Sequence, residues 1–334
     1  MPCPEPSGEA MRRREFISLI GAAAAWPLAS HAQQTDRIRR IGLLMTISEK
    51  EPEAQARLTA FRAGLREKGW IEGRNIQIEY RFAAGEPERA RVAASDLVKL
   101  APDVILANGR AILAALKEAT TTIPIVFVFV PDPVGDGFIA SLARPGGNLT
   151  GLTNFEYDMG GKWVGLLKEV APHVQRTLLI FNPESSPYAR FFLESAKQGA
   201  DAALAPVNDD KEIERTYSEI GDKDSAGVIV VPDLFTAGHR ATIIAQAAIN
   251  RIPTVYPFSY FTIDGGLLSY GPDTLDFFHR SAFYVDRIFN GVQPRDLPVE
   301  APTKFQLMIN LKTAKALGLT VPATLLSQAD RLFE

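Results

Sequence analysis

Short apolar runs alternate with longer segments of helical periodicity along most of this chain, and the order of these segments occurs twice. The runs at residues 41–45, 103–107 and 123–127 have counterparts at 176–181, 226–231 and 252–256, each displaced by about 130 residues. The run at 123–130 is apolar at every position, as expected of a strand buried on both faces of a parallel sheet. We therefore predict an α/β fold of two similar doubly wound parallel-sheet lobes, with two unrelated doubly wound domains as the alternative.

The expected domain boundaries follow from these segments. We assign lobe one to residues 37–155, lobe two to 156–258, a return to lobe one through a hinge to 259–300, and a C-terminal return segment to 301–334. Several crossings between two lobes form a multi-strand hinge rather than a flexible linker. Residues 196–207 are too few for a full helix and a full strand, so we expect the second strand of lobe two to be stunted.

The N-terminal 32 residues have the pattern of an export signal. Basic residues at 12–14 precede an apolar stretch at 17–28, and small residues at Ser30 and Ala32 indicate cleavage near Ala32. The stretch is shorter than the ~20 residues that span a bilayer, so we expect no stable membrane insertion. The basic pair fits both the twin-arginine (Tat) and the Sec routes. Residues 1–10 precede the signal, which leaves Met1 and Met11 as alternative start codons, and an N-terminal helix packed on the domain is the structural alternative to a signal.

Charge and motifs exclude several classes of function. The chain has 36 basic and 39 acidic residues, so nothing favours nucleic acid or an anionic membrane as a partner. One cysteine, Cys3, permits no internal disulfide and no cysteine-based zinc site. The remaining histidines after the signal, His173, His239 and His279, are widely spaced. No phosphate-binding glycine loop or Gly-x-Ser-x-Gly motif occurs, so we predict no metal, no cofactor and no enzyme.

Candidate ligand-binding residues follow the predicted strands, because ligands of open α/β sheets bind beyond the carboxyl ends of the strands. In lobe one these are Ser48, Asn108, Gly109, Arg110 and Asp132; in lobe two they are Asn182, Tyr188, Asp233 and Tyr256. Asp132 could serve as the counter-ion of a ligand ammonium group. Arg110 could form a bidentate clamp on a ligand carboxylate.

Each candidate also has a structural explanation. Turn or cap roles suit Asp132 between two prolines, the Asn108-Gly109 pair, Asn182 before Pro183, and Asp233 before a helix. Arg110 could be a solvated side chain, and Tyr256 could belong to the core. The residues by themselves leave these alternatives open.

Four blocks of sequence carry a family resemblance: residues 132–134, 143–151, 301–305 and 310–314. They resemble the substrate-binding subunits of ABC importers of the TrpX-like class, and the likeness runs from about Arg40 to the C-terminus. The resemblance implies a type I periplasmic binding protein fold, a periplasmic location, and ABC permease and ATPase subunits as partners. Arg110 stands where family members often carry a small hydroxyl residue.

The expected function is therefore capture of a small solute between two closing lobes, followed by delivery to a permease. The resemblance suggests amino acids, aromatic or branched-chain, as the solutes. Two alternatives remain open at this point, a periplasmic ligand-sensing protein for a membrane sensor kinase and an exported α/β enzyme. A repressor-type regulator is disfavoured, because an export signal occupies the place of a DNA-binding headpiece.

Overall fold

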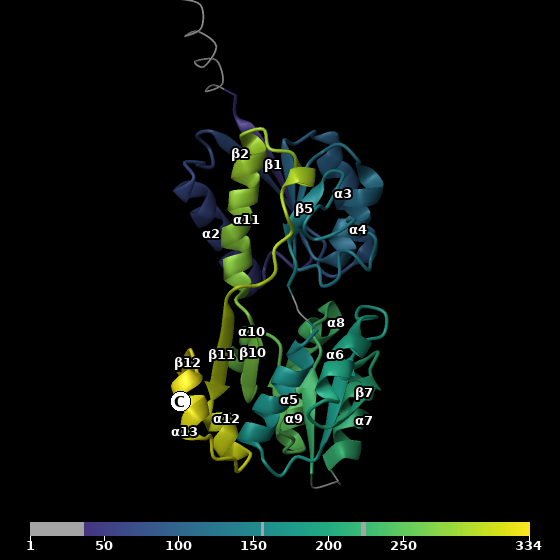
Figure 1. The fold of residues 1–334 in the computed structure, drawn as a ribbon, viewed down its shortest axis with the longest axis vertical. Helices are drawn as coiled ribbons and strands as arrows, with labels where there is room; N and C mark the ends of the chain where they lie inside the picture. Colours follow the sequence, from purple (N-terminus) through teal and green to yellow (C-terminus); the bar gives the residue numbers. More distant parts are fainter. Residues whose placement is uncertain (1–36, 155–156, 222–224) are drawn as a thin grey trace, which may run out of the picture.

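The computed structural model describes residues 37–154, 157–221 and 225–334, which form two lobes stacked along the long axis of the molecule (Figure 1). The predicted export signal lies outside the described residues. Lobe one holds a five-stranded parallel sheet in the order β2-β1-β3-β4-β5. Its strands are β1 (Arg39–Met45), β2 (Ile76–Phe82), β3 (Val104–Asn108), β4 (Ile125–Val128) and β5 (Leu149–Leu152). Every residue of β4 is buried, which confirms the predicted strand buried on both faces of a parallel sheet.

Helices cover both faces of this sheet. They are α2 (Pro52–Glu67), α3 (Pro87–Lys99), α4 (Arg110–Ala119) and α11 (Thr274–Phe289). The side chains of α2 and α11 form one core layer with the sheet, and those of α3 and α4 form another on the opposite face. Helix α11 packs closely along α2 because Gly64 has no Cβ, an atom that would lie 2.4 Å from the carbonyl oxygen of His279.

Lobe two holds a seven-stranded sheet in the order β12-β11-β10-β9-β8-β6-β7. Its strands are β6 (Arg176–Phe181), β7 (Asp201–Pro206), β8 (Ala226–Val230), β9 (Thr254–Tyr256), β10 (Leu268–Pro272), β11 (Phe305–Asn310) and β12 (Arg331–Phe333). Neighbouring strands are parallel except β10 and β11, which are antiparallel. The prediction of a stunted second strand is wrong. The helix before β7 ends at Ala196, which leaves room for six residues that pair with β6 along its length.

The helices of lobe two are α5 (Met159–Val170), α6 (Ala189–Ala196), α7 (Asp210–Gly221), α8 (Leu234–Gly238), α9 (Arg240–Ile249), α10 (Ser259–Ile263), α12 (Leu311–Ala316) and α13 (Ala323–Gln328). A short 3-10 helix, η2 (Pro294–Asp296), lies in the connection after α11. The core of lobe two includes Trp163, Phe192 and Tyr217, all with no exposed surface. None of the helices in the described ranges is both long and apolar enough to cross a bilayer.

The return to lobe one begins later than residue 259. Strand β10 stays in lobe two, because it pairs with β9 on one side and β11 on the other. Helix α11 is the element that joins lobe one, where it packs on α2 (Figure 1). The segment after residue 304 then completes the sheet of lobe two with β11 and β12.

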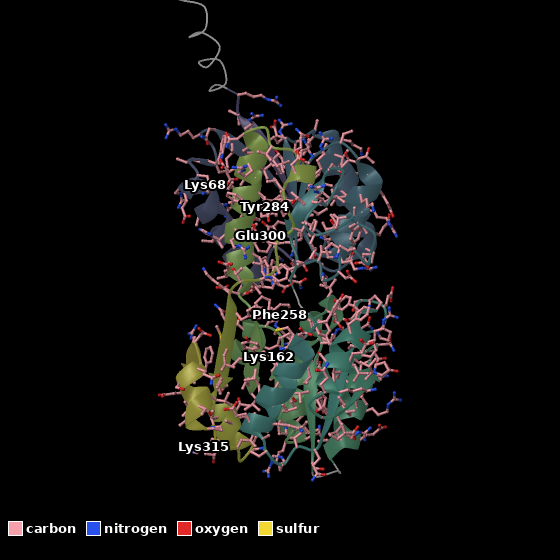
Figure 2. The ribbon with its side chains drawn as sticks, viewed as in Figure 1. Lys68, Lys162, Phe258, Tyr284, Glu300 and Lys315 are labelled. Atoms are coloured by element: carbon pink, nitrogen blue, oxygen red, sulfur yellow. The ribbon has the colours of Figure 1, made fainter. Side chains whose placement is uncertain are left out.

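The chain crosses between the lobes after Leu152, between β10 and α11, and between Glu300 and β11. The backbone N–H of Glu300 donates to Gly151 at 3.1 Å, and its carbonyl oxygen accepts from the N–H of Thr153 at 3.0 Å. The Glu300 carboxylate pairs with Arg280 on α11. Figure 2 labels Glu300 beside α11, above the junction with lobe two. The first and last crossings are thus hydrogen-bonded together as a hinge.

Candidate ligand-binding site

Strand ends from the two sheets meet between the lobes. Phe129 follows β4 of lobe one, and its ring centroid lies 6.1 Å from that of Phe258, which follows β9 of lobe two. Figure 2 shows Phe258 at the edge of lobe two that faces lobe one. Phe129 has a φ of +61°, in the left-handed region that bulky residues rarely adopt. Strained backbone of this kind is concentrated at ligand sites, so this contact marks the junction as a candidate site.

A second group of side chains surrounds Asp132. Its carboxylate accepts a hydrogen bond from the N–H of Gly135 at 2.8 Å, which shows that the predicted turn role is filled. Arg110 forms an ion pair with Asp136 at 2.7 Å, so its guanidinium already has a carboxylate partner. The charge of Arg110 also acts on Tyr188 of lobe two, which places these two predicted residues across the junction from one another.

Tyr157 extends this group from the side of lobe two. Its ring packs on Phe191, with centroids 4.6 Å apart, and its hydroxyl faces the carboxylates of Asp132 and Asp136. Burial raises the pKa of Tyr157 above its ordinary value, and the two carboxylates raise it further. The hydroxyl is buried beside the Asp132 carboxylate, which acts on it both by its charge and as a hydrogen-bond acceptor. Asp132 of lobe one and Tyr157 of lobe two are thus neighbours across the junction.

Asp233 and Asn182 are joined at the carboxyl ends of β8 and β6. The Asp233 carboxylate caps α8 by accepting from the N–H of Thr236 at 2.5 Å, and it accepts from the N–H of Asn182 at 3.1 Å. Burial raises the pKa of Asp233 to about 6, although these hydrogen bonds oppose the shift. The side chain of Asn182 binds its own loop, since it accepts from Ser185 N–H and donates to the Val207 carbonyl. Both residues have the structural roles that the sequence left open.

The other predicted residues are distributed as follows. The hydroxyl of Tyr188 donates to the carbonyl of Pro232 at 2.9 Å. Tyr256 is 1% exposed and stacks on Phe261 inside lobe two, so the structure places it in the core. The carbonyl oxygen of Asn108 accepts a hydrogen bond from the Thr46 hydroxyl, and Gly109 leads into α4.

Ser48 lies in a separate pocket of about 370 Å³ that belongs to lobe one only. The pocket lies beside the ends of β1 and β2 and is lined by Ser48, Glu49, Lys50, Tyr80, Arg81, Phe82, Ala84 and Arg89. Of the predicted residues, this pocket therefore contains only Ser48.

Sequence reasoning missed two residues at the junction. Arg57 on α2 is 6% exposed and lies with Leu58 and Phe61 on the buried face of that helix. Tyr260 on α10 lies opposite, where burial raises its pKa and the charge of Arg57 lowers it. A charged residue at a core position of an amphipathic helix was the available signal for Arg57, because arginine is seldom buried without a partner.

An ion pair also joins the lobes. Arg240 at the start of α9 lies 3.9 Å from Glu51, which precedes α2, and 2.7 Å from Asp264 of its own lobe. Across the described ranges, no group of three or more His, Cys, Asp or Glu side chains is arranged to hold a metal ion. The junction therefore offers charged, hydroxyl and aromatic groups, which are suited to binding a small polar solute.

Known proteins share this architecture. The model of the family described as ABC transporter substrate binding protein matches residues 41–333. A tyrosine-binding protein of Clostridioides difficile (strain R20291) is 24% identical over 293 residues, 86% of this chain and 84% of that protein. A conserved domain protein of Vibrio cholerae is 28% identical with a TM-score of 0.81, and covers 89% of this chain and 100% of its own.

A fourth similarity concerns fold. The ABC domain of Streptococcus pneumoniae in complex with L-Trp is 23% identical, with a TM-score of 0.81 over 88% of this chain and 99% of that chain. The likeness confirms the expected two-lobed type I periplasmic binding protein fold. Because the family match covers most of the chain, this protein belongs to the ABC transporter substrate-binding proteins.

Proposed function

We propose that this protein is the periplasmic solute-binding subunit of an ABC importer and that it captures an amino acid with an aromatic side chain. Membership of the family supports the role in transport. The relative named for tyrosine and the similar structure with L-Trp support the class of solute. The predicted export signal supports a periplasmic location, with the permease and ATPase subunits as partners.

The observation that carries the proposal is the set of groups that the lobes direct at one another. Lobe one supplies the Asp132 carboxylate, and lobe two supplies the hydroxyl of Tyr157 beside it. Phe129 and Phe258 supply aromatic surface from opposite lobes. A zwitterion with an aromatic side chain needs an anion for its ammonium group, donors for its carboxylate and apolar walls for its ring.

Capture follows from this division of contacts. Each lobe holds part of the contact set, so the solute binds most tightly when both lobes touch it and the population shifts toward the closed form. A micromolar solute contributes roughly −8 kcal/mol of binding free energy, which is more than the few kcal/mol needed to shift such an equilibrium. The closed form then presents the permease with a surface that depends on the solute.

Thermal denaturation with a panel of the common amino acids tests the proposal. At about 100 times its Kd, a true ligand raises the stability by roughly 2.7 kcal/mol. We expect L-tyrosine or L-tryptophan to give the largest shift. Absence of a shift with every amino acid would contradict the proposed solute class.

The Asp132→Asn variant tests the role of the carboxylate. It keeps an oxygen for the N–H of Gly135 but loses the charge that attracts an ammonium group, so the affinity should fall about 10- to 100-fold. Asp201→Asn is the matched control, because Asp201 is exposed at the amino end of β7, away from the junction. Equal affinities of the two variants, measured by titration calorimetry, would exclude Asp132 from the site.

A further inference from the structure

Arg57 is a buried cation with an incomplete set of partners. Only 6% of the residue is exposed, and removing a guanidinium from water costs several kcal/mol unless it is paired. Its Nε donates to Oε1 of Glu53 at 2.9 Å. The same oxygen accepts from the hydroxyl of Thr274 at 2.7 Å, so Arg57 shares its single carboxylate partner with a residue of α11.

The two terminal nitrogens of Arg57 are the groups left without a partner. Among the described residues, neither of them donates a hydrogen bond or forms an ion pair, and neither is a fully buried unsatisfied atom. The small exposed part of the residue therefore lies at the guanidinium end. The four N–H donors on the terminal nitrogens are therefore not used by any described residue.

Aromatic rings fix the orientation of this guanidinium. Its central carbon lies 4.8 Å from the ring centroid of Phe129 and 5.7 Å from that of Phe278. Rings that contact a guanidinium leave its donors free at the edge of the plane, which is the geometry that binds a carboxylate through two oxygens. Phe129 also contacts Phe258 of lobe two, so it links Arg57 to the aromatic surface between the lobes.

The groups opposite Arg57 do not neutralise it. The charges that act on Tyr260 of lobe two are those of Arg57, Glu53, Arg240 and Asp233. The Asp233 carboxylate is held by N–H groups of its own lobe. Arg240 has its own carboxylates, Asp264 at 2.7 Å and Glu51 at 3.9 Å. Arg110, the residue that the sequence suggested as a carboxylate clamp, is paired with Asp136. Of these three arginines at the junction, Arg57 is the one whose terminal nitrogens have no carboxylate partner among the described residues.

We infer that Arg57 of lobe one binds the carboxylate of the captured solute through its terminal nitrogens. The inference rests on the proposed function and names the residue that makes the site selective for amino acids over the corresponding amines. Glu53 holds the Nε side of the guanidinium and acts as a positioning residue.

Pairs of probes that differ only in the carboxylate test this role. We use L-tyrosine with tyramine and L-tryptophan with tryptamine, measured by titration calorimetry. The unmodified protein should bind the acid of each pair at least about 100-fold more tightly than the amine. In Arg57→Met the affinity for the acid should fall about 30- to 300-fold, whereas the affinity for the amine should change less than about threefold.

Two further variants sharpen the comparison. Arg57→Lys keeps the charge but loses the planar fork, so it should restore only part of the preference for the acid. Arg91→Met is the matched control, because Arg91 is exposed on α3 and pairs with Glu88. Retained binding of the amine shows that each variant is folded. If the variants do not fold, a crystal structure with L-tyrosine decides, since a carboxylate oxygen should lie within about 3 Å of an Arg57 terminal nitrogen.

The outcomes separate the inference from the proposed function. Equal losses for acid and amine in Arg57→Met would show a purely structural role and overturn the inference. Binding of L-tyrosine or L-tryptophan with no preference over the amine would overturn it as well, while leaving the proposed function intact. Failure of the unmodified protein to bind either amino acid or either amine would overturn both.

Discussion

The hydrogen-bond partners of two buried ionisable residues at the junction differ, and their immediate neighbours decide this difference. Asp233 and Arg57 are 8% and 6% exposed, but their surroundings differ. Asp233 receives N–H donors from Thr236 and Asn182, and burial still raises its pKa to about 6. Arg57 donates its Nε to one carboxylate oxygen, and its terminal nitrogens form no hydrogen bond with a described residue. Asp233 is therefore satisfied within its own lobe, whereas Arg57 keeps donors that the carboxylate of the proposed solute would accept.

The raised pKa of Asp233 predicts a pH-dependent stability. Its folded-state pKa of about 6 lies above the ordinary value of about 3.9, so between these values the folded protein holds more protons than the unfolded chain. The contribution of Asp233 to stability is therefore fully present below pH 4 and is lost as the pH rises to 6.

Asp233→Asn removes this dependence. Relative to the unmodified protein, the free energy of unfolding of the variant should increase by up to about 3 kcal/mol between pH 4 and pH 7. Urea denaturation at pH 4, 5, 6 and 7 measures the difference, with exposed Asp201→Asn as the control. A difference that stays constant with pH would show that the carboxylate titrates at its ordinary value.

At the scale of elements, the junction of β3 with α4 is held by backbone geometry. Gly109 has a φ of +94°, and a Cβ there would lie 2.6 Å from Oγ1 of Thr46, at the end of β1. The Thr46 hydroxyl in turn donates to the carbonyl of Asn108. A tight turn thus aligns the N-terminus of α4 with the ends of β1 and β3.

Gly109→Ala should lower the stability of the protein. The positive φ and the contact with Thr46 together should lower the free energy of unfolding by about 2 kcal/mol or more, because Thr46 must move. Gly73→Ala is the matched control, since Gly73 has a φ of +80° and nothing within 4 Å of its Cβ position, so about 1 kcal/mol is expected. Urea denaturation compares them; equal losses would show that the contact with Thr46 is unimportant.

At the scale of the whole molecule, the lobes are joined by the hinge and by contacts across the junction. The hinge connects Gly151, Thr153 and Glu300 through backbone hydrogen bonds. Outside the hinge, Glu51 of lobe one and Arg240 of lobe two form an ion pair with 3.9 Å between their charged atoms. This ion pair forms only when the two lobes are near one another. It therefore stabilises the closed form relative to the open form.

Glu51→Gln should therefore shift the lobes toward the open form. The affinity for the amino acid that stabilises the protein most should fall two- to fivefold at about 20 mM salt, and the difference should vanish at about 500 mM salt. Arg240 keeps its partner Asp264, which limits other effects. Titration calorimetry at both salt concentrations tests this, with exposed Glu88→Gln as the control. An unchanged affinity at low salt would mean that the pair does not influence closure.

The hydrophobic periodicity of the sequence was sufficient to predict the two lobes but not to predict where each lobe begins and ends. The buried run that became β4 was predicted from local pattern. The place of β10 was not, because a strand of this composition could pair in either sheet and only its partners β9 and β11 decide. The length of β7 was misjudged because the end of the preceding helix depends on its packing.

What the sequence determined by itself was the α/β class, the two similar lobes and the family, because hydrophobic period and short motifs are local properties of the chain. Only the tertiary structure decided which polar side chains were already satisfied. Asn182 and Asp233 follow strands as predicted, yet they bind their own loops, whereas Arg57 lies within a helix and faces the other lobe. Hydrogen-bond partners come from residues far apart in sequence, so a free donor is recognised only after the chain has folded.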